Sequence, residues 1–139
     1  MARGREDIVI MIKLVCLFKI KTGMTQADFV EYYENTHVPL LHELMPQIVR
    51  MSRNYVLPDG VFLPVHAAGG TTSSVLFDVV TEVWFTDRSA FEEVAAITAD
   101  PVLGARIAED EARFIDRSQT TLLLVDEKVS TFDERTTIS

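Results

Sequence analysis

The order of strand-like and helix-like segments is the feature that most constrains this chain. Residues 11–20 alternate with a period of two, and both alternating sets contain apolar side chains, so we expect a strand covered on both faces. Residues 74–86 carry the strongest strand pattern, rich in β-branched and aromatic residues. Further strands are predicted at residues 47–57 and 118–126.

A first helical region follows the first predicted strand. Thr25 is expected to cap it, and helical spacing then relates Phe29, Tyr33, His37, Leu40, Leu41 and Leu44. Pro39 interrupts this pattern, because proline lacks a backbone N–H and its ring crowds the carbonyl of Asn35. We therefore expect a kink next to His37.

A second helical region, split in two, precedes the last strand. Asp87 or Ser89 is expected to cap its first part, and Asp100 followed by Pro101 restarts the helix. The resulting order, β-α-β-β-α-β, predicts an α+β subunit with a ferredoxin-like fold and an antiparallel four-stranded sheet.

Length, charge and cysteine content set the class of protein. The 139 residues fit one domain, which we place at 11–128 between an N-terminal extension at 1–10 and a C-terminal tail at 129–139. A net charge of −8 argues against binding to nucleic acid or to an anionic membrane surface. No apolar run reaches the roughly 18–20 residues that span a bilayer. Cys16 is the only cysteine, which excludes an intrachain disulfide, and we predict a cytoplasmic protein.

His37 is the strongest candidate for a catalytic residue, because it lies on the apolar stripe of the first predicted helix beside the expected kink. Histidine titrates near neutral pH and serves as a general acid or base. The alternative is a core histidine bonded to a backbone carbonyl. His42 lies five residues further on, which misses the separation of four that places two metal ligands on one helical face. We expect no metal and no other cofactor.

Three acids stand where an unpaired charge would be costly. Asp78 and Glu82 share one face of the strand at 74–86, where they either face a cavity as acid–base groups or pair with arginines on a solvated face. Asp116, between the last helix and strand, either orients His37 or caps a turn. Most acids of the predicted helices, a set that includes Asp110, are expected to be solvated or to cap a helix.

Aromatic side chains are candidates for the walls of a binding cavity, although regularly spaced aromatic residues are more often core. We single out Phe18, Tyr33 and Trp84 as ligand-binding candidates. Residues 58–72 form a long predicted loop, of a length often found in lids and binding loops. His66 in that loop could close over a ligand.

Three stretches of the chain resemble the EthD-like family of small dimeric α+β barrel proteins. The first stretch consists of Met11 to Leu14, Thr25 to Phe29 and His37-Val-Pro39. The second runs from Phe77 to Phe85, and the third from Ala112 to Ser118. The resemblance implies a ferredoxin-like subunit whose sheet pairs with that of a second copy to form a barrel. The N-terminal extension and the 58–72 loop depart from a minimal family member.

The resemblance also implies chemistry without metal or flavin, on aromatic polyketides or lactones, by decarboxylation, cyclisation or isomerisation. By this resemblance His37 takes the role of the family's His-x-Pro histidine, and Asp116 that of the acid before the last strand. Our leading hypothesis is a cofactor-independent lyase, cyclase or isomerase that uses His37, Asp116 and Glu82 on an aromatic or polyketide-like molecule. Asp78, Trp84, Tyr33, Phe18 and His66 would bind that substrate. The alternatives are a cofactor-free oxygenase and a noncatalytic binding or accessory protein.

Overall fold

The computed structural model describes residues 11–62 and 76–133, which form four strands and two helical regions. The elements are β1 (Ile12–Phe18), α2 (Gln26–Tyr32), η1 (Tyr33–His37), α3 (Val38–Leu44), β2 (Ile48–Tyr55), β3 (Val79–Phe85), α4 (Arg88–Ala99), α5 (Leu103–Glu111), η2 (Arg117–Gln119) and β4 (Thr121–Val125). The predicted β-α-β-β-α-β order is confirmed, as is the division of the second helical region.

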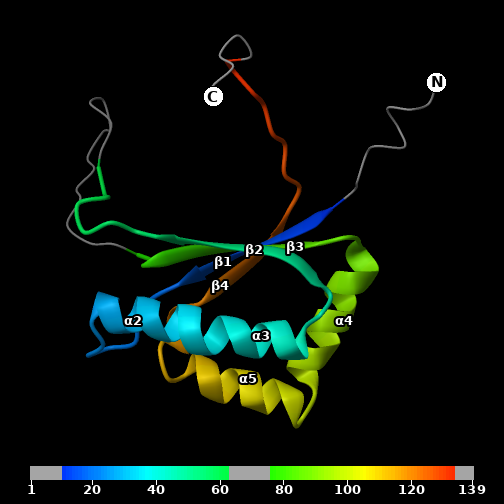
Figure 1. Cartoon of the computed structure of the whole chain (residues 1–139), viewed down its shortest axis with the longest axis horizontal. Helices are drawn as coiled ribbons and strands as arrows, with labels where there is room; N and C mark the ends of the chain where they lie inside the picture. The colour runs from blue at the N-terminus through cyan, green and yellow to red at the C-terminus, as the bar shows by residue number, and fades with distance from the viewer. Residues whose placement is uncertain (1–10, 63–75, 134–139) are drawn as a thin grey trace.

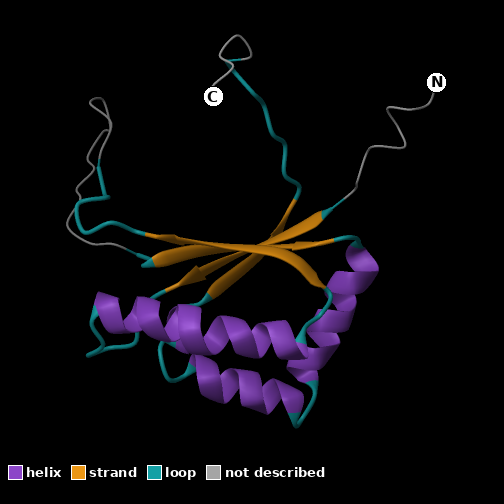
Figure 2. Cartoon of the chain, viewed as in Figure 1, coloured by secondary structure: helices purple, strands orange, loops and turns teal. Residues whose placement is uncertain are grey.

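The strands form one antiparallel sheet in the order β2-β3-β1-β4, the ferredoxin-like arrangement. The helices all lie on one side of it, and the segments at 57–62 and 126–133 extend from the other side (Figures 1 and 2). The sheet therefore has a helix-covered face and an open face. Successive residues of a strand alternate between these faces.

The core lies between the covered face of the sheet and the helices. Its largest fully buried side chains are those of Tyr33, Phe29, Phe85, Phe114, Val79 and Thr81. The rings of Phe29 and Tyr33 lie 5.6 and 5.0 Å from that of Phe114, measured between centroids. Burying each of these side chains contributes roughly 1.5–3 kcal/mol, so this aromatic cluster ties α2 and η1 to the end of the α5 region.

The first helical region contains a π-helical turn where a kink was expected. In η1 the N–H of Val38 donates to the carbonyl of Tyr33, five residues earlier. Pro39 has no N–H to continue the ordinary α-helical ladder, and the wider turn absorbs this loss without ending the helix. The chain thus runs on directly from α2 through η1 into α3.

Side chains of the expected capping residues begin the helices. Thr25 accepts a hydrogen bond from the N–H of Asp28 at 3.1 Å, and Asp87 accepts one from the N–H of Ala90 at 2.8 Å. Asp100 accepts from two backbone N–H groups at the start of the α5 region. None of the helices in the described part of the chain is long and apolar enough to cross a bilayer.

Gly104 allows α4 and α5 to approach each other closely. A Cβ atom at this position would lie 2.2 Å from the carbonyl oxygen of Thr98, a distance that no real contact permits. The backbone of α4 cannot move away without disturbing the core around Val94.

Replacing Gly104 by alanine should therefore lower the free energy of unfolding by about 1–3 kcal/mol, as overpacking typically does. Urea denaturation of the purified variant measures this loss. Ala105→Ser, at the exposed neighbouring position, is the control and should stay within about 0.5 kcal/mol of the parent. A Gly104→Ala variant as stable as the parent would contradict this account of the helix contact.

Candidate functional site

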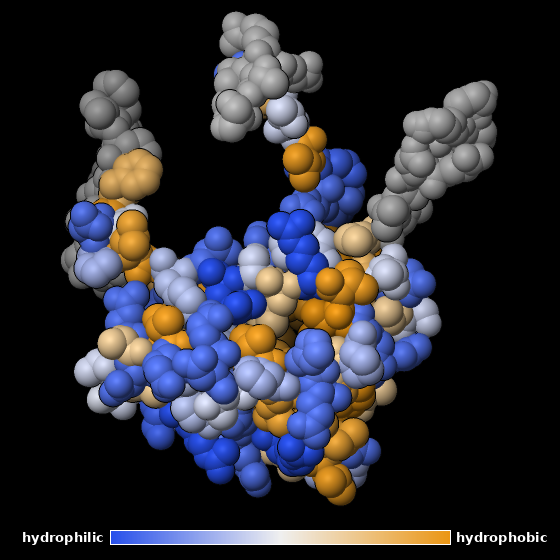
Figure 3. All heavy atoms as spheres, in the orientation of Figure 1, coloured by the Kyte–Doolittle hydropathy of each residue, from blue (hydrophilic) through white to orange (hydrophobic). Residues whose placement is uncertain are grey.

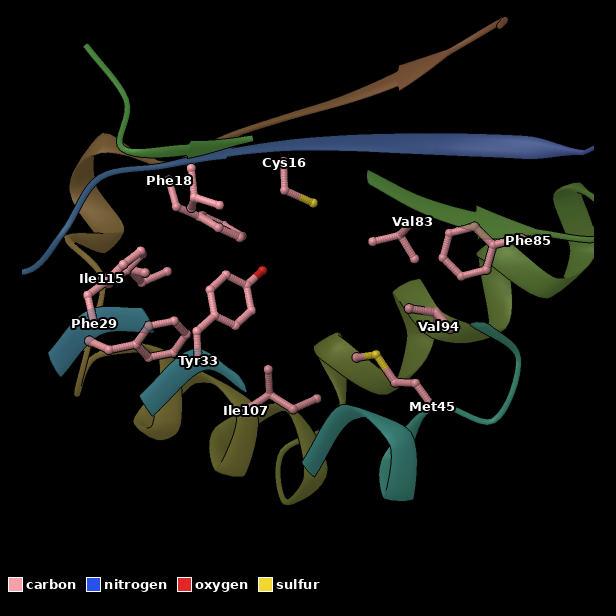
Figure 4. Close-up of a cluster of buried hydrophobic side chains, with 12 residues drawn as sticks. Cys16, Phe18, Phe29, Tyr33, Met45, Val83, Phe85, Val94, Ile107 and Ile115 are labelled. Carbon is pink, nitrogen blue, oxygen red and sulfur yellow. The ribbon is translucent and has the colours of Figure 1, made fainter. Parts of the chain in front are cut away.

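A cavity of about 110 Å³ lies between the covered face of the sheet and the helices. Cys16 and Val83 point into this space from the sheet, and Tyr33, Met45 and Ile107 point towards them from the helices (Figure 4). The lining is mostly apolar, and it also includes a few polar side chains, those of His37, Thr81, Thr98 and Glu111.

His37 forms a buried pair with Asp110 beside this cavity. The distance between His37 Nδ1 and Asp110 Oδ2 is 2.8 Å, and the side chains are only 4% and 6% exposed. An ionised carboxylate can only accept hydrogen bonds, so Nδ1 carries the proton. No hydrogen bond to Nε2 is formed by any residue within 11–62 or 76–133. In the neutral ring Nε2 therefore keeps a lone pair for a ligand.

Further donors hold the Asp110 carboxylate in its charged form. The hydroxyl of Tyr32 donates to Oδ1 at 2.6 Å, and Arg113 Nη1 lies 3.4 Å from the same oxygen. Burial alone would raise the pKa of Asp110, but the hydrogen bonds from Tyr32 and His37 outweigh it and hold this pKa below its ordinary value. Asp110 is thus an acceptor for His37 at neutral pH.

Helix geometry brings the two members of the pair together. His37 is the last residue of the π-helical turn, and its ring packs 4.8 Å from the ring of Phe114. Asp110 follows Ile107 by three positions and precedes Phe114 by four, so it lies on the buried stripe of its helix. Asp110 is therefore an exception to the expectation that the helical acids are mostly solvated or capping, and this spacing was the signal that could have identified it.

Other polar groups of the cavity are neutral or already paired. The Tyr33 hydroxyl lies 2.6 Å from Thr81 Oγ1, and burial raises the pKa of this tyrosine. Burial also raises the pKa of the Cys16 thiol to about 12, so this cysteine is not a thiolate nucleophile at neutral pH. Glu111, which the sequence did not single out, accepts a hydrogen bond from Arg117 Nε at 3.1 Å.

Comparison with known proteins identifies the family of this fold. The EthD domain matches residues 21–118, well over half of the chain. The protein belongs to the EthD family. No curated protein sequence matches it significantly.

Solved structures with the same fold are distant in sequence. An ethyl tert-butyl ether D (EthD) family protein from Bacillus halodurans superposes with a TM-score of 0.55 at 20% identity, covering 85% of this chain and 99% of its own. SnoaB from Streptomyces nogalater, described as a cofactor-independent oxygenase, superposes with a TM-score of 0.54 at 14% identity. The match covers 87% of this chain and 96% of SnoaB. HapK from Hahella chejuensis superposes with a TM-score of 0.52 at 17% identity, and the match covers 87% of this chain and 96% of HapK. At these identities the similarity establishes the fold alone.

Within this EthD chain, two of the predicted acids have structural partners away from His37. Asp116 accepts hydrogen bonds from the hydroxyl of Ser118 at 2.6 Å and from its N–H at 3.1 Å, which caps η2. The expectation that Asp116 orients His37 is thus corrected, since the carboxylate that contacts the His37 ring is that of Asp110. Asp78 accepts a hydrogen bond from the N–H of Ile20 at 2.8 Å and so ties β3 to the chain beyond β1.

Glu82 and Trp84 lie on the open face of the sheet. Glu82 pairs with Lys13 at 2.7 Å and accepts from Ser52 at 3.0 Å. The hydrogen bond from Lys13 outweighs partial burial and lowers the pKa of Glu82. The ring of Trp84 contacts Lys13 and Arg50, at 4.9 and 4.6 Å from its centroid. The partner of Glu82 is thus Lys13, whereas the sequence had suggested an arginine. Neither Glu82 nor Trp84 lines the cavity that contains His37.

The remaining residues considered from the sequence lie in different places. Tyr33 and Phe18 line the cavity as expected from their place on the apolar stripes. His42 is exposed on α3. His66 lies outside the described residues. Among those residues no group of three or more histidine, cysteine, aspartate or glutamate side chains is arranged to hold a metal ion.

The pairing of Asp110 predicts an acid-sensitive contribution to stability. Its pKa is lowered on folding, so the contribution is complete above the ordinary value of 3.8 and is lost as the pH falls through the lower folded value. Asp110→Asn should cost roughly 1–3 kcal/mol of unfolding free energy at neutral pH, since a buried donor loses its charged acceptor. The difference from the parent should shrink below about pH 3.8.

Urea unfolding between pH 7 and pH 2 measures this difference. Glu109→Gln removes an exposed carboxylate from the same helix and should match the parent within about 0.5 kcal/mol throughout. A difference for Asp110→Asn that does not shrink below about pH 3.8 would contradict the proposed pairing.

Proposed function

We propose that this EthD protein is a cofactor-independent acid–base enzyme, a lyase, cyclase or isomerase, that acts on an aromatic or polyketide-like small molecule. The observation that carries the proposal is the buried His37–Asp110 pair on the wall of an apolar cavity. A carboxylate that holds the Nδ1 proton of a histidine orients the ring and leaves Nε2 to act as a general base. We propose His37 as the catalytic residue and Asp110 as its positioning residue.

The proposed step is a reversible proton transfer. Nε2 of His37 takes a proton from an enolisable carbon or a phenolic hydroxyl of the substrate, whose electron pair moves into the adjoining carbonyl or ring. The imidazolium that forms is stabilised by the Asp110 carboxylate, and it returns the proton to another atom of the same molecule. The aromatic side chains of Phe18 and Tyr33 would hold the substrate ring, and the Tyr33 hydroxyl could hydrogen-bond its oxygen.

A second candidate is a cofactor-free oxygenase, which the structural likeness to SnoaB favours. The same base would generate a carbanion or phenolate, which would transfer electrons to molecular oxygen and form a carbon–oxygen bond with it. The resulting peroxide anion would take the proton back from the His37 imidazolium. Oxygen uptake that matches product formation would favour the oxygenase over a lyase, cyclase or isomerase. Tight binding without conversion would instead indicate an accessory role in the cytoplasm.

His37→Ala should lower turnover by about 10²- to 10⁴-fold, the usual contribution of a general base. Asp110→Asn should cause a large part of the same loss, because the amide no longer fixes the Nδ1–H form of the ring. Steady-state kinetics on a substrate found by screening enolisable phenols and aromatic ketones measures both. The fold of each variant is checked by circular dichroism.

Glu109→Gln, exposed on the helix that carries Asp110, should leave turnover unchanged. Full activity of a folded His37→Ala variant would exclude His37 as the base.

We also propose that a second copy of the chain covers the open face of the sheet. Val15, Leu17, Val80 and Leu123 place apolar side chains on this face, and no helix in the described part of the chain covers it (Figure 2). Apolar residues on both faces of β1 are typical of a strand that is buried on both sides. Pairing of two open faces would remove this surface from water.

Leu123→Arg should therefore convert a dimer to a monomer, because it places a charge in the apolar part of that interface. Leu123 is 46% exposed in the single chain, so the change should not disturb the fold. Sedimentation equilibrium measures the mass of parent and variant. Arg88→Ala, at an exposed position on α4, is the control and should remain dimeric. A monomeric parent would contradict the proposal.

A further inference from the structure

The π-helical turn η1 is attached to the sheet by polar contacts as well as to α5 by the His37–Asp110 pair. Within the described chain, three of its five side chains bond to groups on other elements. Tyr33 contacts Thr81 on β3, His37 contacts Asp110 on α5, and Glu34 contacts β2. Figure 3 views the side of the molecule on which β2 and this turn lie, and hydrophilic side chains cover part of the seam between sheet and helices there.

The Glu34 carboxylate is held by three donor groups from β2. Arg53 Nε lies 2.9 Å from Oε2, and Arg53 Nη2 lies 2.7 Å from Oε1, which is the two-point geometry of a strong arginine–carboxylate pair. The hydroxyl of Tyr55 donates to Oε2 at 2.5 Å. The hydrogen bonds from Arg53 outweigh partial burial and lower the pKa of Glu34, so this carboxylate is charged at neutral pH.

The contacts of Tyr33 and Glu34 attach the turn to one cross-strand pair of the sheet. Arg53 and Thr81 lie opposite each other in the register of β2 and β3. Thr81 Oγ1 lies 2.6 Å from the Tyr33 hydroxyl, and Arg53 binds Glu34, the next residue of the turn. One contact alone leaves a helix able to rotate about its axis, whereas two contacts on neighbouring strands fix this rotation.

The rotation of the turn decides where the His37 ring points, because His37 follows Tyr33 by four residues and Glu34 by three in the same turn. A catalytic side chain has to stay within roughly 0.5 Å and 10–20° of its productive geometry. Turns of this kind are rare, and they occur frequently at functional sites. The sheet holds the turn on one side, and Asp110 receives the Nδ1 proton on the other.

We propose that Glu34, Arg53 and Tyr55 are positioning residues of the His37 site, which hold the π-helical turn at the rotation that aims His37 Nδ1 at Asp110. None of these three side chains lines the cavity, so their effect on chemistry passes through the turn. This inference rests on the proposed function for its catalytic meaning, but the placement of His37 that it predicts is measured without a substrate.

Exchange of the His37 Nδ1 proton with water tests this placement. The motion that frees the proton must also break the bonds between Glu34 and Arg53, so weakening those bonds makes the motion more frequent. Glu34→Gln should therefore speed the exchange by about tenfold or more, as expected when a hydrogen bond between charged groups is lost. NMR with saturation transfer from water measures the exchange rate, on full-length protein labelled with nitrogen-15 at histidine.

Glu82→Gln is the matched control for Glu34→Gln. Like Glu34, Glu82 is a partly buried carboxylate whose pKa is lowered by a cationic side chain and a hydroxyl donor, but it lies on the open face. Both variants should lose unfolding free energy in urea, and only Glu34→Gln should speed the exchange at His37. An equal acceleration in both variants would reduce the effect to general instability and overturn the proposal, as would a Glu34→Gln variant that exchanges like the parent.

Two milder variants decide the question even where Glu34→Gln fails to fold. Arg53→Lys keeps the positive charge but loses the planar two-point geometry, so a positioning role predicts faster exchange and a role of charge alone predicts no change. Tyr55→Phe keeps the ring that packs against Phe29 and Tyr33 and removes one hydrogen bond, so it should speed exchange by a smaller factor. Exchange as slow as in the parent in both variants would overturn the proposal.

Turnover separates the positioning proposal from the catalytic one. Glu34→Gln should lower kcat by up to about a hundredfold, the cost of misplacing a catalytic group by roughly 1 Å, and should change KM little because the cavity wall is intact. Full turnover of a folded His37→Ala variant would refute the catalytic proposal. Faster Nδ1 exchange in Glu34→Gln, with none in Glu82→Gln, would still support the positioning of His37.

Discussion

The hydrogen bond between His37 and Asp110 is the interaction on which the candidate site depends. Both side chains are almost fully buried, and a buried donor that loses its charged acceptor typically costs about 1–3 kcal/mol. The pair also joins the π-helical turn to the second helical region, so its geometry is fixed by the packing of both. Tyr32 and Arg113 complete the set of donors to the carboxylate. The same contacts that keep Asp110 charged therefore fix which nitrogen of His37 carries the proton.

The alternation of residues along β3 separates two polar clusters that are neighbours in sequence. Thr81 faces the cavity and contacts Tyr33, whereas Glu82 and Trp84 contact Lys13 on the open face. The sheet itself thus lies between the clusters. We propose that the covered face serves chemistry and the open face assembly, because among the described residues only the covered face has a cavity with a histidine on its wall.

The sequence predicted the fold well, because periodicity and capping residues are local signals. Thr25, Asp87 and Asp100 cap as expected, and periodicity predicted the ferredoxin-like order and placed His37 on the buried stripe of its helix. The resemblance to the EthD family agrees with that order. The partner of His37 could not be found in this way, because it depends on how two helices distant in sequence pack. Asp116 was favoured for its place before the last strand. Asp110 was overlooked as one helical acid among many, although its spacing from Ile107 and Phe114 placed it on the buried stripe.

The most direct measurement of the central claim is the protonation state of the His37 ring. Nitrogen-15 NMR of protein labelled at histidine distinguishes the two neutral forms of an imidazole and its charged form. The structure predicts that neutral His37 carries its proton on Nδ1, and that Asp110→Asn weakens this preference. A neutral His37 protonated on Nε2, or a ring whose form is the same with and without the Asp110 carboxylate, would contradict the account.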